Sequence, residues 1–199
     1  MKRTVLILLG VFALTIAAAA QQGRGGAPPA PLPLEPGASQ EDVDKAVLAA
    51  PPNMRAQSTV IKWNPQDWTY TTLRKGTNRL VCFDSSGFPG QDPFSVECSS
   101  IGNLDRIKQN LQIEAEPDRA KRQALVAEAE KNGTRPKPEF GSIWYHLWGK
   151  DQASARSHMT VAVPGATAQS LGIPDNNKMG GVWIMDAGTS AAHLMIPGF

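Results

Sequence analysis

The C-terminal stretch Gly180-Gly-Val-Trp-Ile-Met-Asp-Ala-Gly-Thr-Ser-Ala-Ala-His-Leu-Met-Ile-Pro-Gly-Phe199 decides the fold class. It holds two short apolar runs around a turn of small residues, a pattern typical of two β-strands. An earlier stretch, 157–165, repeats the order of a histidine, apolar residues and Pro-Gly. Strands of this kind need partners to pack against, so the rest of the chain must supply further strands and covering helices.

Outward from these strands, the sequence predicts an α+β domain. Asn64-Pro-Gln-Asp67 is a turn between two runs of β-formers, which predicts a hairpin. Ser39 is expected to cap a short helix, and Pro117 to open a longer helix that ends at Asn132-Gly133. We expect a mainly antiparallel sheet of six or seven strands with one or two covering helices. Besides the two closing strands, the expected strands are 58–63, 68–75, 80–84, 142–149 and 157–163, with a short extended segment at 94–98; the expected helices are 39–50, 104–111 and 117–131.

The N-terminus has the features of a secretory signal peptide over residues 1–20. Lys2 and Arg3 precede an apolar run, which ends in four alanines before Gln21. A membrane anchor is the weaker interpretation because the run is short and ends in small residues. Residues 21–38 hold mainly glycine, proline and alanine, which predicts a disordered tether. A single α+β domain is then expected over residues 39–199.

The charge balance and the two cysteines bear on location and partners. The chain has 20 basic and 18 acidic residues, and removal of residues 1–20 with Lys2 and Arg3 leaves 18 of each. No clustered basic excess points to nucleic acid, and no later segment is apolar for long enough to cross a membrane. We therefore expect a periplasmic or secreted protein. In that setting Cys82 and Cys98 are predicted to form a disulfide.

Three histidines on predicted strands are the main candidates for chemistry: His146, His158 and His193. Period-two alternation puts His158 and His193 on the less apolar sides of their strands, so the two are expected to share one face of the sheet. We therefore expect a binding site at the three histidines and Trp183. Two interpretations of the histidines remain open, half-exposed polar residues on the outer face or a three-histidine site for zinc or a similar divalent metal.

Three blocks of sequence together resemble a family of exported bacterial proteins of uncharacterised function. The first block is Lys75-Gly-Thr-Asn78 with Cys82 and Cys98; the second is Ser142-Ile-Trp-Tyr145 with His158-Met-Thr-Val-Ala-Val-Pro164; the third is Trp183-Ile-Met185, Gly188-Thr189 and Ala192-His-Leu-Met-Ile-Pro197. The resemblance covers residues 58–197 and departs at Arg79-Leu80, where other members carry Gly-Phe or Gly-Trp. It implies export and a single domain, and it implies no reaction.

No catalytic motif of a known class accompanies these residues. The sequence lacks a Walker loop, Gly-x-Ser-x-Gly, His-Glu-x-x-His and Cys-x-x-Cys. We therefore expect a non-catalytic module of the cell envelope that binds a small molecule or an envelope protein and needs no cofactor. The alternatives are a metal-dependent enzyme that uses the strand histidines and a structural protein of the envelope.

Overall fold

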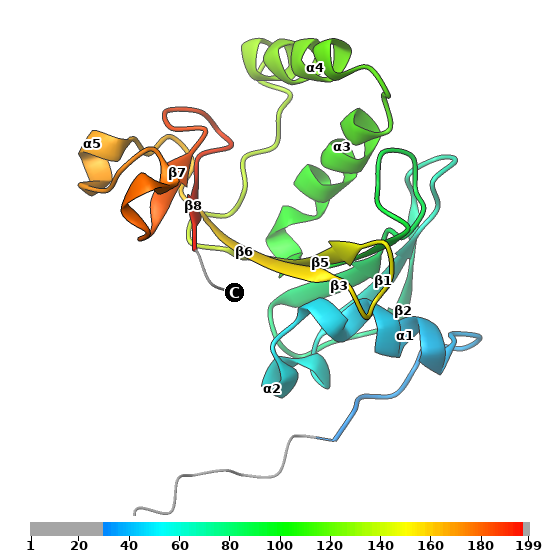
Figure 1. Ribbon diagram of the computed structural model, residues 1–199. Helices are drawn as coiled ribbons and strands as arrows, with labels where there is room; N and C mark the ends of the chain where they lie inside the picture. The colour runs from blue at the N-terminus through cyan, green and yellow to red at the C-terminus, as the bar shows by residue number, and fades with distance from the viewer. Residues whose placement is uncertain (1–29, 197–199) are drawn as a thin grey trace, which may run out of the picture.

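A computed structural model describes residues 30–196, which form an α+β fold around one eight-stranded sheet (Figure 1). The strand order is β2-β1-β3-β4-β5-β6-β8-β7. The strands are β1 Thr59–Trp63, β2 Tyr70–Arg74, β3 Leu80–Asp84, β4 Phe94–Ser100, β5 Ile143–Gly149, β6 Arg156–Ala162, β7 Trp183–Met185 and β8 His193–Met195.

The sheet is mainly antiparallel, as expected, because six of its seven strand pairings are antiparallel; it is nevertheless mixed, and it has eight strands where six or seven were expected. β1 and β2 form the expected antiparallel hairpin, but β3 then pairs with β1 in parallel. The chain leaves β2 through the turn at Gly76 and returns to the other side of β1. A side chain at Gly76 would collide with the backbone at Thr59, so the close approach requires glycine. Hydrophobic alternation is the same for either pairing direction, so the sequence pattern could not distinguish them.

One face of the sheet is covered by the N-terminal helices α1 Gln40–Ala46, η1 Val47–Ala49 and α2 Pro52–Arg55 (Figure 1). Ser39 caps α1 as predicted, because its side chain accepts a hydrogen bond from the Asp42 backbone N–H. Val43 and Val47 pack against Val60 and Tyr145 of the sheet in one buried cluster. The short helix α2 was not predicted; it begins at Pro52, a residue suited to the first helical turn.

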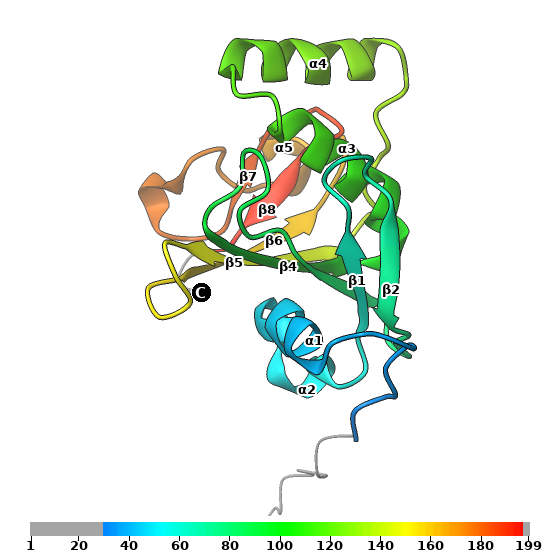
Figure 2. The same cartoon turned by 90° about the vertical axis from the view of Figure 1, so that its right-hand side faces the viewer.

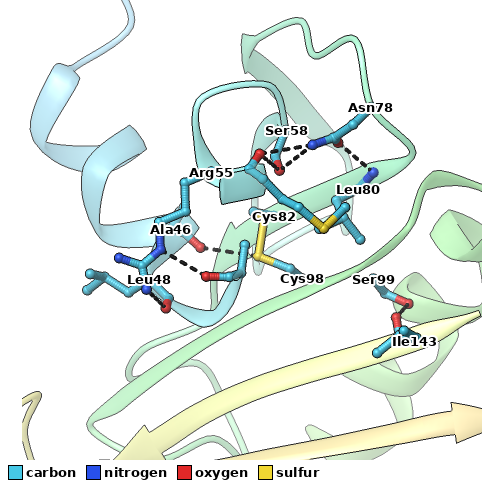
Figure 3. Close-up of a disulfide and its surroundings, with 12 residues drawn as sticks. Ala46, Leu48, Arg55, Ser58, Asn78, Leu80, Cys82, Cys98, Ser99 and Ile143 are labelled. Atoms are coloured by element: carbon cyan, nitrogen blue, oxygen red, sulfur yellow. Dashed lines mark hydrogen bonds between the residues drawn. A yellow bond between two sulfur atoms is a disulfide. The ribbon is translucent and has the colours of Figure 1, made fainter. Parts of the chain in front are cut away.

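The predicted disulfide between Cys82 and Cys98 is confirmed and lies within this cluster (Figure 3). The two residues face each other across β3 and β4, with a Cα separation of 4.1 Å. Both are fully buried beneath the segment that carries Ala46 and Leu48. The bridge therefore joins two neighbouring strands at the centre of the sheet.

The opposite face is covered by α3 Leu104–Glu114, which follows the turn η2 Ile101–Asn103. Ile107 and Leu111 of α3 pack on Ile61, Val81 and Phe83 of the sheet. Helix α4, Arg119–Lys131, lies beyond α3 on the side away from the sheet (Figures 1 and 2). This distance from the sheet is consistent with the high exposure of α4, in which only Ala129 is buried.

Helix α4 begins two residues later than predicted. Asp118 is its N-cap, and its carboxylate accepts a hydrogen bond from the Lys121 backbone N–H. Pro117 therefore lies before the helix, not at its first position. A side chain that accepts from the first turn decides the start more strongly than the fixed φ of proline. The predicted end is confirmed, with Asn132 as the C-cap and Gly133 at φ 69°.

The last part of the chain extends the sheet beyond β6. β8 pairs with Thr160, Val161 and Ala162 of β6, and β7 forms the outer edge. Val163, Ile184 and Ala192 form a small separate core there. Short helical turns complete this region: α5 Ala168–Leu171 and η3 Asn177–Met179.

The segment predicted to be a disordered tether contacts the fold in its C-terminal part. Leu34 and Ala38 pack against the cluster around the disulfide, and the Glu35 backbone N–H donates to the carbonyl oxygen of Leu73. Leu34 supplies the bulky apolar contact in this part of the segment. The predicted signal peptide and tether residues 21–29 lie outside the described residues. Within 30–196, no helix is both long and apolar enough to cross a membrane.

Candidate functional site

The three histidines lie on the face of the sheet that α3 covers, so the predicted common face of His158 and His193 is confirmed. His146 on β5 is directly opposite His158 on β6. His193 on β8 is opposite Ala162, four residues further along β6. Four residues of a strand span about 13 Å, so His193 lies well away from the other pair.

This spacing does not support the three-histidine metal site. Among residues 30–196, no group of three His, Cys, Asp or Glu side chains is placed to hold a metal ion. Trp183 lies on the edge strand β7 opposite Met195, and it lines neither of the cavities described next. The geometry therefore brings His146 and His158 together and leaves His193 and Trp183 apart from them.

Two adjoining cavities lie between α3 and this face of the sheet, and we call them together the α3 groove. The first, of about 340 Å³, is lined by Arg106, Arg135 and His193 among others. The second, of about 460 Å³, is lined by residues that include Glu97 and His146. The two cavities share three lining residues, namely Asn110, Glu114 and Trp144. Two of the three predicted histidines thus border these adjoining cavities, His193 the first and His146 the second.

A pair of carboxyl groups marks the second cavity. Glu97 of β4 is buried; Trp144 Nε1 donates to its Oε2 over 2.7 Å, and Ser85 Oγ donates to its Oε1 over 3.3 Å. Burial raises the pKa of Glu97, and these donors only partly oppose the shift. Glu114 accepts a 2.6 Å hydrogen bond from Gln91 Nε2. Burial, followed by the nearby charge of Glu97, raises the pKa of Glu114 to about 7, so this group exchanges a proton near neutral pH.

His146 is part of the same polar network and is held neutral. Its Nε2 lies 2.9 Å from the hydroxyl oxygen of Ser95, and its ring stacks on Trp148 with centroids 4.6 Å apart. Burial lowers the pKa of His146 to about 4, against a small opposing effect of Asp92. Ser95 is fully buried, so this serine–histidine pair cannot present a nucleophile to a substrate. It serves to fix the side chains around Glu97.

Two arginines line the first cavity from different elements. Arg106 of α3 is 5% exposed and donates through Nη1 to the carbonyl oxygen of Pro136 and to Ser190 Oγ. Arg135 donates through Nη1 and Nη2 to the side-chain oxygens of Gln109 and Asn110, both over 2.7 Å. Burial, followed by the charge of Arg135, lowers the pKa of Arg106 to about 10, and burial also lowers the pKa of Arg135.

Neither guanidinium has a carboxylate partner within 4 Å in the part of the chain that the structure describes. The Nε atom of Arg135 is also buried without a hydrogen-bond partner there. Buried charges in proteins are normally paired. The first cavity therefore holds two guanidinium groups that make no direct ion pair, and Glu114 and Asp186 line it as well.

His193 and Asp186 border the same cavity. His193 Nδ1 lies 2.7 Å from the carbonyl oxygen of Ala191 and donates to it. Asp186 Oδ2 is 4.0 Å from the same ring nitrogen, and Asp186 has φ 51°, a conformation unusual for a residue with a side chain. The Asp186 side chain is more than half exposed, and its charge, after that of Glu130, partly opposes the lowering of the Arg106 pKa.

No protein-family model matches the chain, and no curated protein or solved structure is detectably similar to it.

Four residues of the α3 groove were not predicted from the sequence: Glu97, Arg106, Glu114 and Arg135. A signal for some of them is present. Ser95, Glu97 and Ser99 alternate with apolar residues, which marks the polar face of a strand. Arg106, Asn110 and Glu114 recur every four residues, which places them on one side of a helix. Arg135 lies in an irregular segment and carries no such signal.

Proposed function

We propose that this protein binds a small ligand through an anionic group, such as a carboxylate, held by Arg106 and Arg135 in the α3 groove. The observation that carries the proposal is that the buried Arg106 and the half-buried Arg135 line one cavity without a carboxylate ion-pair partner among the described residues. Arginine is well suited to carboxylates because its planar donors match their two oxygens. This function is the small-ligand form of the binding module expected from the sequence.

The energetic reason lies in the burial of the two charges. An unpaired buried charge is costly, and two like charges close together add repulsion. Burial lowers the pKa of both arginines, and the charge of Arg135 lowers that of Arg106 further. The charges of Glu130 and Asp186 on Arg106, and of Glu130 and Glu114 on Arg135, only partly oppose this cost. An anion in the cavity would relieve both effects at once. Hydrogen bonds to charged groups contribute on the order of 1.5–3 kcal/mol, which is enough for measurable binding by a small ligand.

The test is a titration of the purified protein with acetate, butyrate, valerate and inorganic phosphate by calorimetry. We expect at least one of these anions to bind, and its affinity to fall as salt is raised. In Arg135→Gln we expect a loss of about tenfold or more in affinity, since a charged donor pair is removed. Arg119→Gln is the matched control, because Arg119 lies exposed in the first turn of α4. No binding by the wild type, or equal losses in both variants, would contradict the proposal.

We also propose that the protein is exported to the periplasm or beyond, as a member of the family that its sequence resembles. The disulfide and the absence of a membrane-spanning helix among residues 30–196 are compatible with this location. The expected partner is a small molecule, and nucleic acid is not expected because the charges balance after removal of residues 1–20. Mass spectrometry of exported protein should find Gln21 at the N-terminus. A chain that retains Met1 would contradict cleavage after Ala20.

A further inference from the structure

Three groove residues follow one another along α3 at intervals of four: Arg106, Asn110 and Glu114. Positions four apart lie on the same side of a helix. Arg106 and Glu114 are thus at the two ends of a line about 12 Å long, since each residue of a helix rises 1.5 Å. Arg135 joins this line at its middle, where its Nη2 donates to Asn110. The groove therefore has a cationic end and an acidic end on one helix face.

We infer that the ligand of the α3 groove is an amino carboxylate, with its carboxylate at Arg106 and Arg135 and its ammonium group at Glu114. This inference rests on the proposed binding of an anion at the two arginines. It goes further because it assigns a second, oppositely charged contact and so defines the class of ligand. Glu114 lines both cavities, and a single ligand that enters the groove can reach both ends.

The surroundings of Glu114 favour a cation from outside the protein. Its only side-chain hydrogen bond within residues 30–196 comes from Gln91, so one carboxylate oxygen is left without such a bond. No lysine or arginine of the described chain lies within 4 Å of it. Arg122 borders the second cavity but donates to the backbone carbonyls of Glu116 and Pro117. Asp92 and the buried Glu97 line the same cavity, and the charges of Arg135 and Arg122 act on Glu114 only from beyond ion-pair distance.

Trp144 lies between the two ends and suits the middle of such a ligand. It borders both cavities, and its Nε1 is already bound to Glu97, so its ring is held in place. An ammonium group near an indole ring gains further electrostatic stabilisation. The apolar ring edge also suits a short chain of methylene groups between the two charged groups.

The test compares each acid with the amino acid of the same chain length: acetate with glycine, butyrate with γ-aminobutyrate, and valerate with δ-aminovalerate. For the length that fits, we expect the amino acid to bind at least about tenfold tighter than the plain acid, because it adds one charge-assisted hydrogen bond. Glu114→Gln should abolish this advantage while the plain acid binds as well as before. Glu128→Gln, on the exposed side of α4, is the matched control and should retain the advantage.

A measurement on the wild type alone gives an independent check, should Glu114→Gln fold poorly. An ammonium group beside Glu114 favours its ionised form, so binding of the amino acid at pH 6.5 should release protons, whereas the plain acid should release none. Calorimetry in buffers with different ionisation enthalpies measures this release. Equal affinities of acid and amino acid at every length, without proton release, would overturn the inference and leave the anion site intact. Absence of binding by all six compounds and by inorganic phosphate would overturn both.

Discussion

Glu114 predicts a specific pH dependence of stability. In the folded protein its pKa is raised from 4.5 to about 7 by burial and by Glu97. In the unfolded chain we take its ordinary value of 4.5. Between these values the folded state binds the proton more tightly than the unfolded state does. The contribution of Glu114 to stability is therefore fully present below pH 4.5 and is lost as the pH rises through 7.

The magnitude follows from the size of the shift. Each pKa unit corresponds to 1.36 kcal/mol, so a shift of about 2.5 units changes the free energy of unfolding by about 3 kcal/mol. Glu114→Gln removes the ionisable group but keeps a side-chain oxygen to accept the hydrogen bond from Gln91. At pH 8 the variant lacks the buried negative charge that the wild type carries. The free energy of unfolding of Glu114→Gln, measured relative to that of the wild type, should therefore increase by about 3 kcal/mol between pH 4 and pH 8.

His146 provides a second comparison with the opposite sign. Burial lowers its pKa from 6.5 to about 4, so its contribution to stability is present above pH 6.5 and is lost as the pH falls through 4. The free energy of unfolding of His146→Gln, relative to that of the wild type, should therefore increase as the pH falls, again by about 3 kcal/mol. The two variants thus diverge from the wild type in opposite directions along one pH series.

Urea unfolding of the three proteins at half-unit steps from pH 4 to 8, followed by tryptophan fluorescence, measures these differences. The protein contains five tryptophans, and three of them lie on β5 or β7. A difference between Glu114→Gln and the wild type that stays constant within about 1 kcal/mol over the whole range would refute the assignment, because a 2.5-unit shift requires about three times as much.

Three further substitutions test the fold around the groove. Replacing Cys82 and Cys98 by alanine should lower the free energy of unfolding by about 3 kcal/mol, as expected for release of a loop of this length, and a urea series giving a loss below about 1 kcal/mol would contradict the stabilising role of the bridge. Gly90→Ala should lower the free energy of unfolding by about 2 kcal/mol or more and weaken ligand binding. Gly90 has φ 80°, and an added Cβ would collide with the carbonyl oxygen of Glu114. Unchanged stability would rule out this close packing. Asp118→Ala should lower the free energy of unfolding by about 1 kcal/mol, because it removes the N-cap of α4. We expect hydrogen exchange to become faster only in the first turn of that helix.

Local sequence features predicted the elements whose cause is local. Ser39 precedes acidic residues and an apolar run, and it caps α1. Asn132-Gly133 marks the end of α4. Alternation of period two predicted the common face of His158 and His193, because successive side chains of a strand point to opposite faces of the sheet. The cysteine pair was predicted from its even count in a chain that was itself predicted to be exported.

The features that sequence reasoning missed depend on the path of the chain between elements. Whether β3 pairs with β1 in parallel is decided by the turn around Gly76, not by the strand residues. Arg106 and Arg135 are brought to one cavity by a helix, a turn and an irregular segment that lie between them in the sequence. Neither residue has a local partner that marks it as part of a site. Their role becomes visible only when the distances to all the carboxylates are known.

The groove also spans two regions that differ in how firmly they are held. The wall with His193 and Asp186 belongs to β8 and its adjoining turn, which are attached to the sheet through Thr160, Val161 and Ala162 and have a small core of their own. The opposite side rests on strands joined by a disulfide. In hydrogen exchange the amides of β7 and β8 should thus open at a lower free energy than those of β3 and β4. A ligand that contacts both regions slows this opening, so occupancy of the groove can be read from the exchange rates of the last two strands.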